Sequence, residues 1–377
     1  MPQSVAAFQE EAQMSLIDRI TEDLGRIVSA ESPSTEYGML ESCLGVIRQV
    51  GEEWLGVEPR RVDTDGVPNL LWQFGARVEV LLLCHYDTVW PAGTIDRWPF
   101  SVDGDKATGP GIFDMKAGII QSFASVSSLQ ARDGVAILVT GDEEVGSAKT
   151  RSLIEETARG ARAVIVLESS IDGALKTSRK GPSFWTATFS GRAAHAGLDP
   201  EKGASVITAI SKWVPAVEQL NDRAAGTSVV VTMAKAGTAM NVVPSVAEVM
   251  VDSRAVTIAE QERVDREIRL IPSGVAGVTI EYEGGVNRLP LEDRMSHGLK
   301  ARLDAVCERI GHPLIPGQAA GGASDGNITA ALGVPTLDGF GAVGDYAHAE
   351  GEWASLSALA DRSVLMTAFI ADLLQND

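Results

Sequence analysis

The chain has 377 residues, 45% of them hydrophobic and 22% charged, which is the composition of an ordinary folded protein and excludes a disordered one. Its 32 Lys and Arg residues against 51 Asp and Glu residues leave a formal charge of −19, which repels nucleic acid and anionic lipid surfaces. We therefore expect no nucleic-acid or membrane partner, and the length predicts two domains at roughly 150 residues each.

The N-terminal segment MPQSVAAFQEEAQ lacks the basic start and the apolar stretch of a signal peptide. The longest apolar run covers residues 80–84, far fewer than the roughly 20 that cross a bilayer. Cys43, Cys84 and Cys307 are an odd set without the spacing of a disulfide framework. Together these features predict a cytoplasmic protein.

The first part of the chain alternates between helix and strand patterns. Apolar residues at helical spacing predict a helix that ends before Pro33 and a second over about 36–55. Short apolar runs predict strands at 69–74, 78–84, 135–140 and 163–167, with helices at about 115–130 and 147–158. Two of these runs, VEVLLLC and VAILVTG, are almost entirely apolar, which is typical of strands buried on both faces of a parallel sheet.

A different order of elements begins near residue 178. The patterns predict strands at 183–190, 228–235, 246–254 and 278–283, with helices at 204–220 and 258–270. This β-α-β-β-α-β order is the ferredoxin-like pattern. After residue 289 the earlier pattern returns, with a helix near 293–310, a strand at 334–337 and a closing helix from 354.

The sequence thus predicts an α/β fold with a discontinuous main domain. Residues 1–177 and 290–377 would form a domain with a mostly parallel sheet, and residues 178–289 an inserted α+β ferredoxin-like domain.

Acidic and imidazole side chains follow the ends of three predicted strands. His85 and Asp87 end the first, Glu143 and Glu144 the second, and Glu168 the third. Open parallel sheets bind ligands at the carboxyl ends of their strands. A carboxylate two residues after a histidine can orient a metal-binding imidazole. Of two adjacent glutamates, one can bind a metal ion while the other transfers a proton.

Two further candidates lie in loops. Asp114 lies in the glycine-rich segment GPGIFDMKAG, and His348 in GDYAHAEGE. Taken singly, these side chains also fit surface histidines, a helix-capping aspartate or a solvated acidic turn. Taken together, two imidazoles and three carboxylates form a ligand set for two cations, for which zinc is suited and cobalt or manganese are substitutes.

A series of motifs runs along nearly the whole chain: HYDTV, GPGIFDMKAG, GDEEVGS, the strand end at Glu168, GRAAHAGLDPEKG, AGTAMNVVP, GGASD and HAEGE. In this order they resemble the family of dinuclear zinc hydrolases that includes carboxypeptidase G (glutamate carboxypeptidase), aminoacylase and succinyl-diaminopimelate desuccinylase. The resemblance implies a zinc-hydrolase catalytic domain, with the inserted domain acting as a lid through which two chains form a homodimer.

The resemblance also implies a ligand set with two zinc ions per subunit. One zinc would be bound by His85 and Glu168 and the other by Glu144 and His348, with Asp114 bridging both.

Two more positions match catalytic residues of the family. Asp87 matches the residue that orients His85, and Glu143 matches the general base that takes a proton from the attacking water. In the family the peptide bond after the bridging aspartate is cis, so Asp114–Met115 is expected to be cis.

Four positions match substrate-contacting residues of the family. His195 is similar to the lid histidine that reaches into the partner's site and stabilises the oxyanion. Asn241 and Arg254 resemble lid residues that bind the substrate carboxylate. Arg288, in GVNRLP, resembles an arginine that binds a glutamate side chain in carboxypeptidase G.

The expected activity is zinc-dependent hydrolysis of an amide bond next to a free carboxylate, by a glutamate-carboxypeptidase-like exopeptidase acting on an N-acylated amino acid or peptide. One alternative is an N-acyl-amino-acid deacylase or desuccinylase of the same family. Another is a catalytically silent protein that binds metal or carboxylates, which would lack some ligands or the base.

Overall fold

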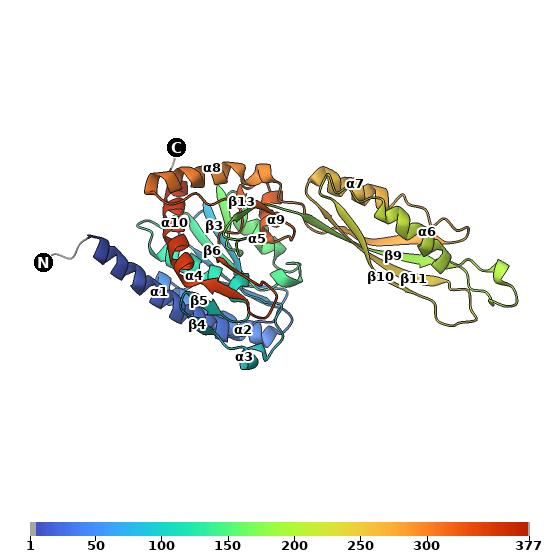
Figure 1. Cartoon of the computed structure of the whole chain (residues 1–377), viewed down its shortest axis with the longest axis horizontal. Coiled ribbons are helices and arrows are strands. Elements are labelled where there is room, and N and C mark those ends of the chain that lie inside the picture. The colour runs from blue at the N-terminus through green and yellow to red at the C-terminus, as the bar shows by residue number, and fades with distance from the viewer. Residues whose placement is uncertain (1–4, 376–377) are drawn as a thin grey trace. The chain divides into compact units, whose positions relative to one another are not determined.

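The computed structural model describes residues 5–375, with side chains from residue 13 onward. Residues 1–4 of the N-terminal segment MPQSVAAFQEEAQ, for which no signal peptide is expected, lie outside the described residues. The chain divides into two compact units (Figure 1). Unit 1 comprises Met1–Thr177, Asp293–Ala320 and Ser324–Asp377, and unit 2 comprises Ser178–Glu292 and Gly321–Ala323. The second boundary thus follows Glu292 rather than residue 289.

A six-stranded sheet forms the centre of unit 1. Its order is β1 (Arg60–Thr64), β2 (Val67–Gln73), β6 (Val135–Thr140), β3 (Val80–His85), β7 (Ala163–Val166) and β14 (Thr336–Leu337). The last four strands are parallel, whereas β1 and β2 form an antiparallel hairpin at one edge. This confirms the predicted mostly parallel sheet. β1 was not predicted from the sequence, because its segment RRVDT has no apolar run and is largely exposed.

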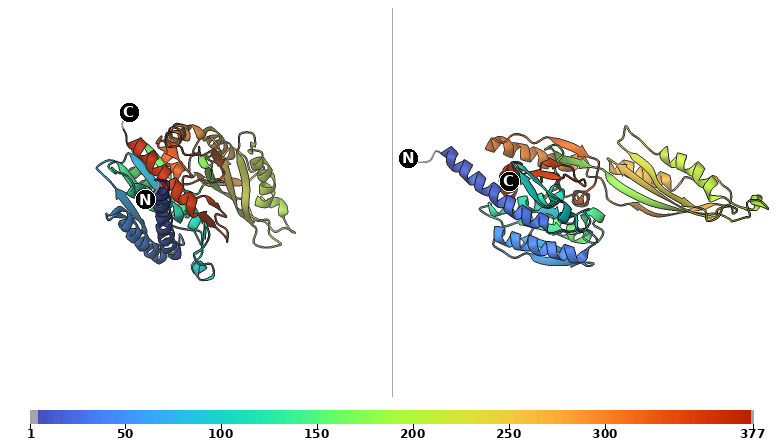
Figure 2. Two further views of the ribbon diagram at one scale, coloured as in Figure 1. Left: turned by 60° about the vertical axis from the view of Figure 1, so that its left-hand side comes forward. Right: turned by 60° about the horizontal axis from the view of Figure 1, so that its bottom comes forward.

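Helices cover both faces of this sheet (Figures 1 and 2). One face packs against α1 (Val5–Ser29), α2 (Tyr37–Leu55), α4 (Ala117–Ser127) and α10 (Leu356–Leu374). The other face packs against α5 (Arg151–Ala158) and α9 (Asp325–Ala331). α8 (Asp293–Ile310) adds Leu299, Leu303 and Val306 to the first cluster. Burial on both faces explains why the central strands are almost wholly apolar.

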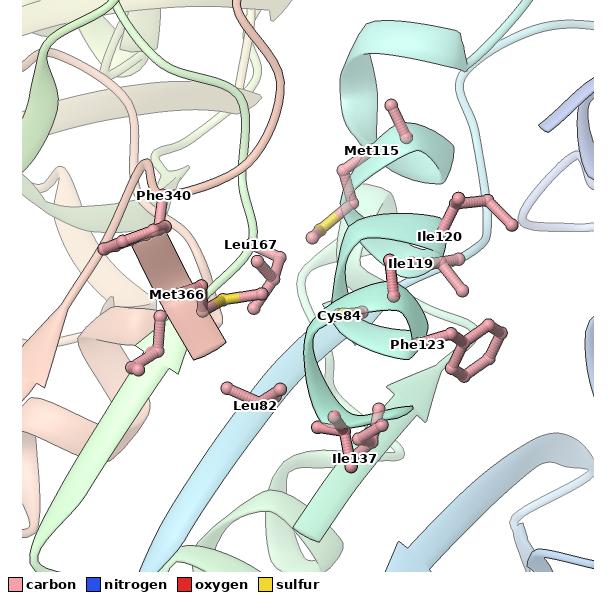
Figure 3. Packing of buried hydrophobic residues seen from close by; sticks show 14 of the residues in the cluster. Leu82, Cys84, Met115, Ile119, Ile120, Phe123, Ile137, Leu167, Phe340 and Met366 are labelled. Carbon is pink, nitrogen blue, oxygen red and sulfur yellow. The ribbon is translucent and has the colours of Figure 1, made fainter. Parts of the chain in front are cut away.

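Helix α4 packs closely on the ends of the central strands. Ile119, Ile120 and Phe123 lie in the core beside β3 and β6 (Figure 3). Gly118 permits this approach, because a Cβ atom there would lie 2.2 Å from the carbonyl oxygen of Leu167. The predicted helix at 115–130 begins only at Ala117, since residues 112–116 form a wider turn. The loop before α4 is therefore anchored at the strand ends.

A small antiparallel sheet adjoins this loop. It has the order β15 (Gly344–Asp345), β16 (Trp353–Ser355), β5 (Lys106–Thr108) and β4 (Ser101–Asp103). Trp353 pairs with Thr108, so the chain entering β16 lies beside the chain leaving β5. These short strands were not predicted from the sequence, and neither were α3 (Thr94–Arg97) and the paired strands β8 (Leu175–Arg179) and β13 (Gly317–Ala320).

Unit 2 contains β9 (Gly181–Ser190), α6 (Val206–Glu218), β10 (Ser228–Ala236), β11 (Val246–Ala255), α7 (Ile258–Ile268) and β12 (Thr279–Val286). Its antiparallel sheet has the order β10-β11-β9-β12, which fits the predicted ferredoxin-like pattern. Both helices pack on one face of the sheet, around Trp185, Phe189 and Trp213.

None of the helices formed by residues 5–375 combines the length and apolar character needed to cross a bilayer.

Asp372 fastens α10 to α8. Its carboxylate accepts hydrogen bonds from Arg302 and Arg309 at 2.6 and 2.7 Å. Burial alone would raise the pKa of Asp372, but the two guanidinium groups hold it below its usual value of 3.8. A carboxyl with a lowered pKa stabilises the fold above its unfolded pKa, and this contribution is lost as the pH falls through the lower folded value. Asp372→Asn should therefore cost about 1–2 kcal/mol of unfolding free energy at pH 7, and less near pH 3.

Urea unfolding of the variant and the wild type at both pH values measures this difference. Asp304→Asn is the control. Within residues 5–375, Asp304 forms an ion pair with Lys300 of its own helix in a partly exposed contact, and its loss should cost less than about 0.5 kcal/mol. A loss that is equal at pH 7 and pH 3 would contradict the charge-based explanation.

Candidate metal centre

The candidate ligands of unit 1 meet because their strands are neighbours. β6, β3 and β7 lie side by side and parallel, so their carboxyl ends share one edge of the sheet. His85 is the last residue of β3, Glu144 follows β6, and Glu168 follows β7. Asp114 comes from the loop between β5 and α4, and His348 from the loop between β15 and β16.

These five side chains form two groups that share one residue. His85, Asp114 and Glu168 make the first group, and Asp114, Glu144 and His348 make the second. In each group, the potential ligand atoms lie within 4.8 Å of one another, close enough to hold a metal ion. The peptide bond Asp114–Met115 is cis, as the resemblance predicted.

Asp114 directs its two carboxylate oxygens to different histidines. Oδ1 lies 3.2 Å from His85 Nε2, and Oδ2 lies 3.2 Å from His348 Nε2. The remaining carboxylates complete the groups, with Glu168 Oε1 3.5 Å from His85 Nε2 and Glu144 Oε2 3.2 Å from His348 Nε2. This arrangement can hold two cations with one shared carboxylate.

Charge and burial shift the pKa values of these groups. Burial opposes protonation of His85, yet the carboxylates of Asp114, Asp87 and Glu168 raise its pKa well above the usual range. Hydrogen bonds with Asp114 and Glu144 raise the pKa of His348 to about 10. A metal ion binds only the deprotonated imidazole nitrogen, so cation binding must displace these protons and should strengthen with rising pH.

The pKa values of the carboxyl groups of Asp114 and Glu144 are shifted in opposite directions. Burial would raise the pKa of Asp114, but its hydrogen bonds with His348 and His85 hold it well below the usual range. Burial raises the pKa of Glu144, despite the hydrogen bond with His348. Of these two carboxyl groups, Asp114 is therefore the one whose surroundings favour the charged form.

Asp87 is fully buried behind the metal groups. Its side-chain oxygen lies 3.4 Å from His85 Nδ1, and its backbone oxygen lies 3.0 Å from the same nitrogen. The carboxylate also accepts hydrogen bonds from the backbone amides of Glu143 and Glu144, both at 3.1 Å, and from Ser34 at 2.8 Å. Asp87 therefore links the ends of β3 and β6, a contact that the sequence analysis did not predict.

Glu143 is half-buried and directly precedes Glu144 in the short turn after β6. Because its backbone amide is fixed by Asp87, the start of its side chain is fixed as well. The turn thus presents two adjacent glutamates, of which only Glu144 belongs to a metal group.

The other four predicted site residues lie in unit 2. His195 and Asn241 lie in exposed neighbouring loops, joined by a hydrogen bond from the Ala196 amide to the Asn241 carbonyl. His195 Nδ1 accepts hydrogen bonds from the backbone amides of Gly197 and Leu198, both at 3.1 Å. In the neutral imidazole the proton therefore lies on Nε2, which can act as a hydrogen-bond donor.

Arg254 lies at the opposite end of the unit 2 sheet, near the end of β11. Its guanidinium forms two hydrogen bonds of 2.8 Å with the carboxylate of Asp252. The Arg254 guanidinium, which was expected to bind a substrate carboxylate, thus binds the carboxylate of Asp252 in its own strand. Arg288 is buried, and its carbonyl accepts a hydrogen bond from Gln261.

Glu352 is a residue of the centre that the sequence analysis missed. Its carboxylate is fully buried and accepts the backbone amide of Asp114 at 2.9 Å. Burial raises the pKa of Glu352 to about 7. Glu352 is the last residue of the motif HAEGE, and nothing in that motif indicates that it lies beside the Asp114 loop.

The sequence profile of Peptidase family M20/M25/M40 matches residues 81–372. Carboxypeptidase G2 of Pseudomonas sp. (strain RS-16) is 30% identical over 317 residues, which cover 78% of this chain and 74% of that protein. Succinyl-diaminopimelate desuccinylase of Paracoccus denitrificans is 30% identical over 251 residues, covering 59% and 65%.

Among solved structures, the fold is similar to that of the YxeP protein of Bacillus subtilis, described as a dinuclear metal-binding peptidase. The TM-score is 0.66 at 15% identity, and the match covers 95% of this chain and 99% of that one.

Proposed function

The chain belongs to peptidase family M20/M25/M40, and from this membership we propose a zinc-dependent hydrolase that cleaves an amide bond next to a free carboxylate, as a glutamate-carboxypeptidase-like exopeptidase does. The membership confirms the family resemblance inferred from the motifs and makes the protein a hydrolase. The likeness to carboxypeptidase G2 supports the proposed substrate class.

One observation carries the proposal. Two groups of imidazole and carboxylate side chains share Asp114, whose two oxygens face different histidines. A shared carboxylate between two ligand groups is the arrangement that places a pair of divalent ions about 3.5–4 Å apart in hydrolases.

We propose that this centre holds two zinc ions per subunit, with cobalt or manganese as substitutes. The donor set of imidazole nitrogen and carboxylate oxygen fits zinc. His85 and Glu168 would bind one ion and Glu144 and His348 the other, with Asp114 between them. When bound, the pair would supply Lewis acidity to the attacking water and to the scissile carbonyl.

Glu143 is proposed as the general base. It would take a proton from the attacking water and return it to the leaving amine, so that no net proton is consumed within the site. Asp87 would keep both partners in place, since it contacts His85 Nδ1 and holds the amide of Glu143.

The unit 2 residues would bind the substrate. His195 Nε2 is available to donate to the oxyanion, because Nδ1 is already bonded to backbone amides. Asn241 and Arg254 would bind the free carboxylate of the substrate, for which Arg254 must exchange its contact with Asp252. Arg288 would bind the side chain of a glutamate product.

If two chains form a homodimer through unit 2, His195, Asn241 and Arg254 can all contact substrate. The strand from Val246 to Arg254 alone spans about 27 Å at roughly 3.4 Å per residue, and Asn241 lies beyond its start. A small N-acylated amino acid cannot touch both ends, so His195 and Asn241 would serve the site of the partner. β10 is an edge strand of the unit 2 sheet, and its exposed residues Val230 and Met233 would contribute to such an interface.

A second candidate function is an N-acyl-amino-acid deacylase or desuccinylase of the same family, which the likeness to succinyl-diaminopimelate desuccinylase supports. A silent binding protein is disfavoured, because all five candidate ligands and Glu143 are present. The cytoplasmic location stays a prediction.

One set of measurements on the purified chain tests the proposal. We expect two zinc ions per chain and a solution mass near twice 39.8 kDa. We also expect the protein to release glutamate from N-acyl or folate-like glutamate conjugates. This activity should stop when the metal is removed by a chelator and return when zinc is added. N-acetyl and N-succinyl amino acids are the comparison substrates, and their preferred cleavage would favour the second candidate. Unchanged turnover after complete metal removal would exclude both metal-dependent functions.

A further inference from the structure

We propose that Glu352 is a positioning residue that fixes the backbone of the Asp114 loop for metal binding, an inference that rests on the proposed metal centre. Glu352 lies four residues after His348 in the loop between β15 and β16. Its side chain is 0% exposed, although carboxylates are seldom fully buried unless they are paired. Glu352 belongs to neither metal group, so metal binding by its own carboxylate does not explain its burial.

The carboxylate accepts four N–H groups, three of them from the backbone of a single loop. Oε1 accepts the amides of Phe113 at 2.7 Å and Asp114 at 2.9 Å. Oε2 accepts the amide of Gly111 at 3.1 Å and the indole nitrogen of Trp90 at 3.0 Å. Buried backbone donors must find partners, and here one side chain supplies the partner for three of them.

The loop needs such support because regular structure does not define it. Gly111 has a left-handed φ of 72°, and a Cβ atom there would lie 2.4 Å from the side chain of Thr88. Asp114 (φ −121°, ψ 94°) and Met115 (φ −133°, ψ 35°) have non-helical backbone angles within the turn that leads into α4. Glu352 therefore takes the place of the missing helix or strand hydrogen bonds.

Fixing the Asp114 amide also fixes the direction in which its carboxylate leaves the backbone. That carboxylate must direct Oδ1 to His85 and Oδ2 to His348, so a small rotation would loosen both ligand groups. The hairpin loop that carries Glu352 also carries His348, and β16 pairs with β5 directly before the Asp114 loop. Glu352 thus couples the loops of the two ligands and should affect both ions.

The test is metal binding by the full-length Glu352→Gln protein. The amide keeps the size of the side chain but retains only one acceptor oxygen and turns an NH₂ group toward backbone donors. We expect zinc and cobalt affinity, measured by calorimetry, to fall by about 10- to 100-fold, and the visible absorption bands of bound cobalt to shift.

Two controls separate positioning from general stability. Trp90→Phe removes one of the four donors and leaves the three amides, so metal affinity should change by less than about threefold. Asp23→Asn alters another buried carboxylate, which accepts the indole N–H of Trp54 in α2. It should lower the melting temperature and leave metal affinity unchanged.

The outcomes are distinguishable. A Glu352→Gln protein that binds two ions with wild-type affinity and cobalt spectrum would overturn the inference and leave the metal centre intact. A wild-type protein that binds no metal would refute the metal centre itself. If the variant does not fold, hydrogen exchange of the wild-type protein is the test. The amides of Phe113 and Asp114 should exchange at least 100-fold more slowly than amides in an unstructured chain. Exchange of these amides without protection would overturn the inference.

Discussion

Glu143→Gln should lower kcat by about 10³-fold while both metal ions remain bound. Glutamine keeps the shape of the side chain but cannot accept the proton of the attacking water, and a positioned general base typically contributes 10²- to 10⁴-fold. Metal binding should persist because Glu143 belongs to neither ligand group. Its backbone amide would still donate to Asp87, so the turn that carries Glu144 should keep its place. Steady-state kinetics and elemental analysis of the same preparation measure both quantities.

The adjacent residue provides the matched control. Glu144→Gln changes the same functional group one position later, and Glu144 Oε2 lies 3.2 Å from His348 Nε2 in the second ligand group. This variant should lose metal as well as activity. Wild-type turnover by the Glu143→Gln protein, or loss of metal from it, would show that Glu143 is not the proposed base.

The fold was largely predictable because its main strands are long apolar runs and its helices have apolar residues at helical spacing. β3 and β6 have every residue buried, and such strands leave a nearly unbroken apolar run in the sequence. The β1 strand and the small sheet of β4, β5, β15 and β16 leave no such run, because they are short and partly exposed. Their positions depend on pairing with distant segments, which a local pattern does not record.

The same contrast explains what was and was not predictable at the metal centre. His85 and Glu168 follow the apolar strands β3 and β7, so the sheet topology alone brings them to one edge. Glu352 depends instead on the pairing of Trp353 with Thr108, between segments about 245 residues apart. The tautomer of His195 likewise depends on backbone amides of its own loop, whose geometry no motif specifies.

Asp114→Asn should have a larger effect on metal content than any other single change at the centre. Asp114 is the one side chain common to both ligand groups, and each of its oxygens serves a different group. Asparagine removes the negative charge and leaves a single oxygen, so one group loses its Asp114 ligand and the other keeps only a neutral amide oxygen. We expect the metal content to fall from two ions to one or none per chain, and kcat/KM to fall at least about 10³-fold, equivalent to several kcal/mol of transition-state stabilisation.

Glu168→Gln is the matched comparison, because Glu168 belongs only to the group of His85. If the two groups bind ions separately, this variant should lose one ion and keep the ion held by Glu144 and His348. The Asp114 variant should lose affinity at both positions in the same titration. Equal metal loss from the two variants would contradict a shared carboxylate, since only a bridge makes the removal of Asp114 more damaging than the removal of a ligand from one group.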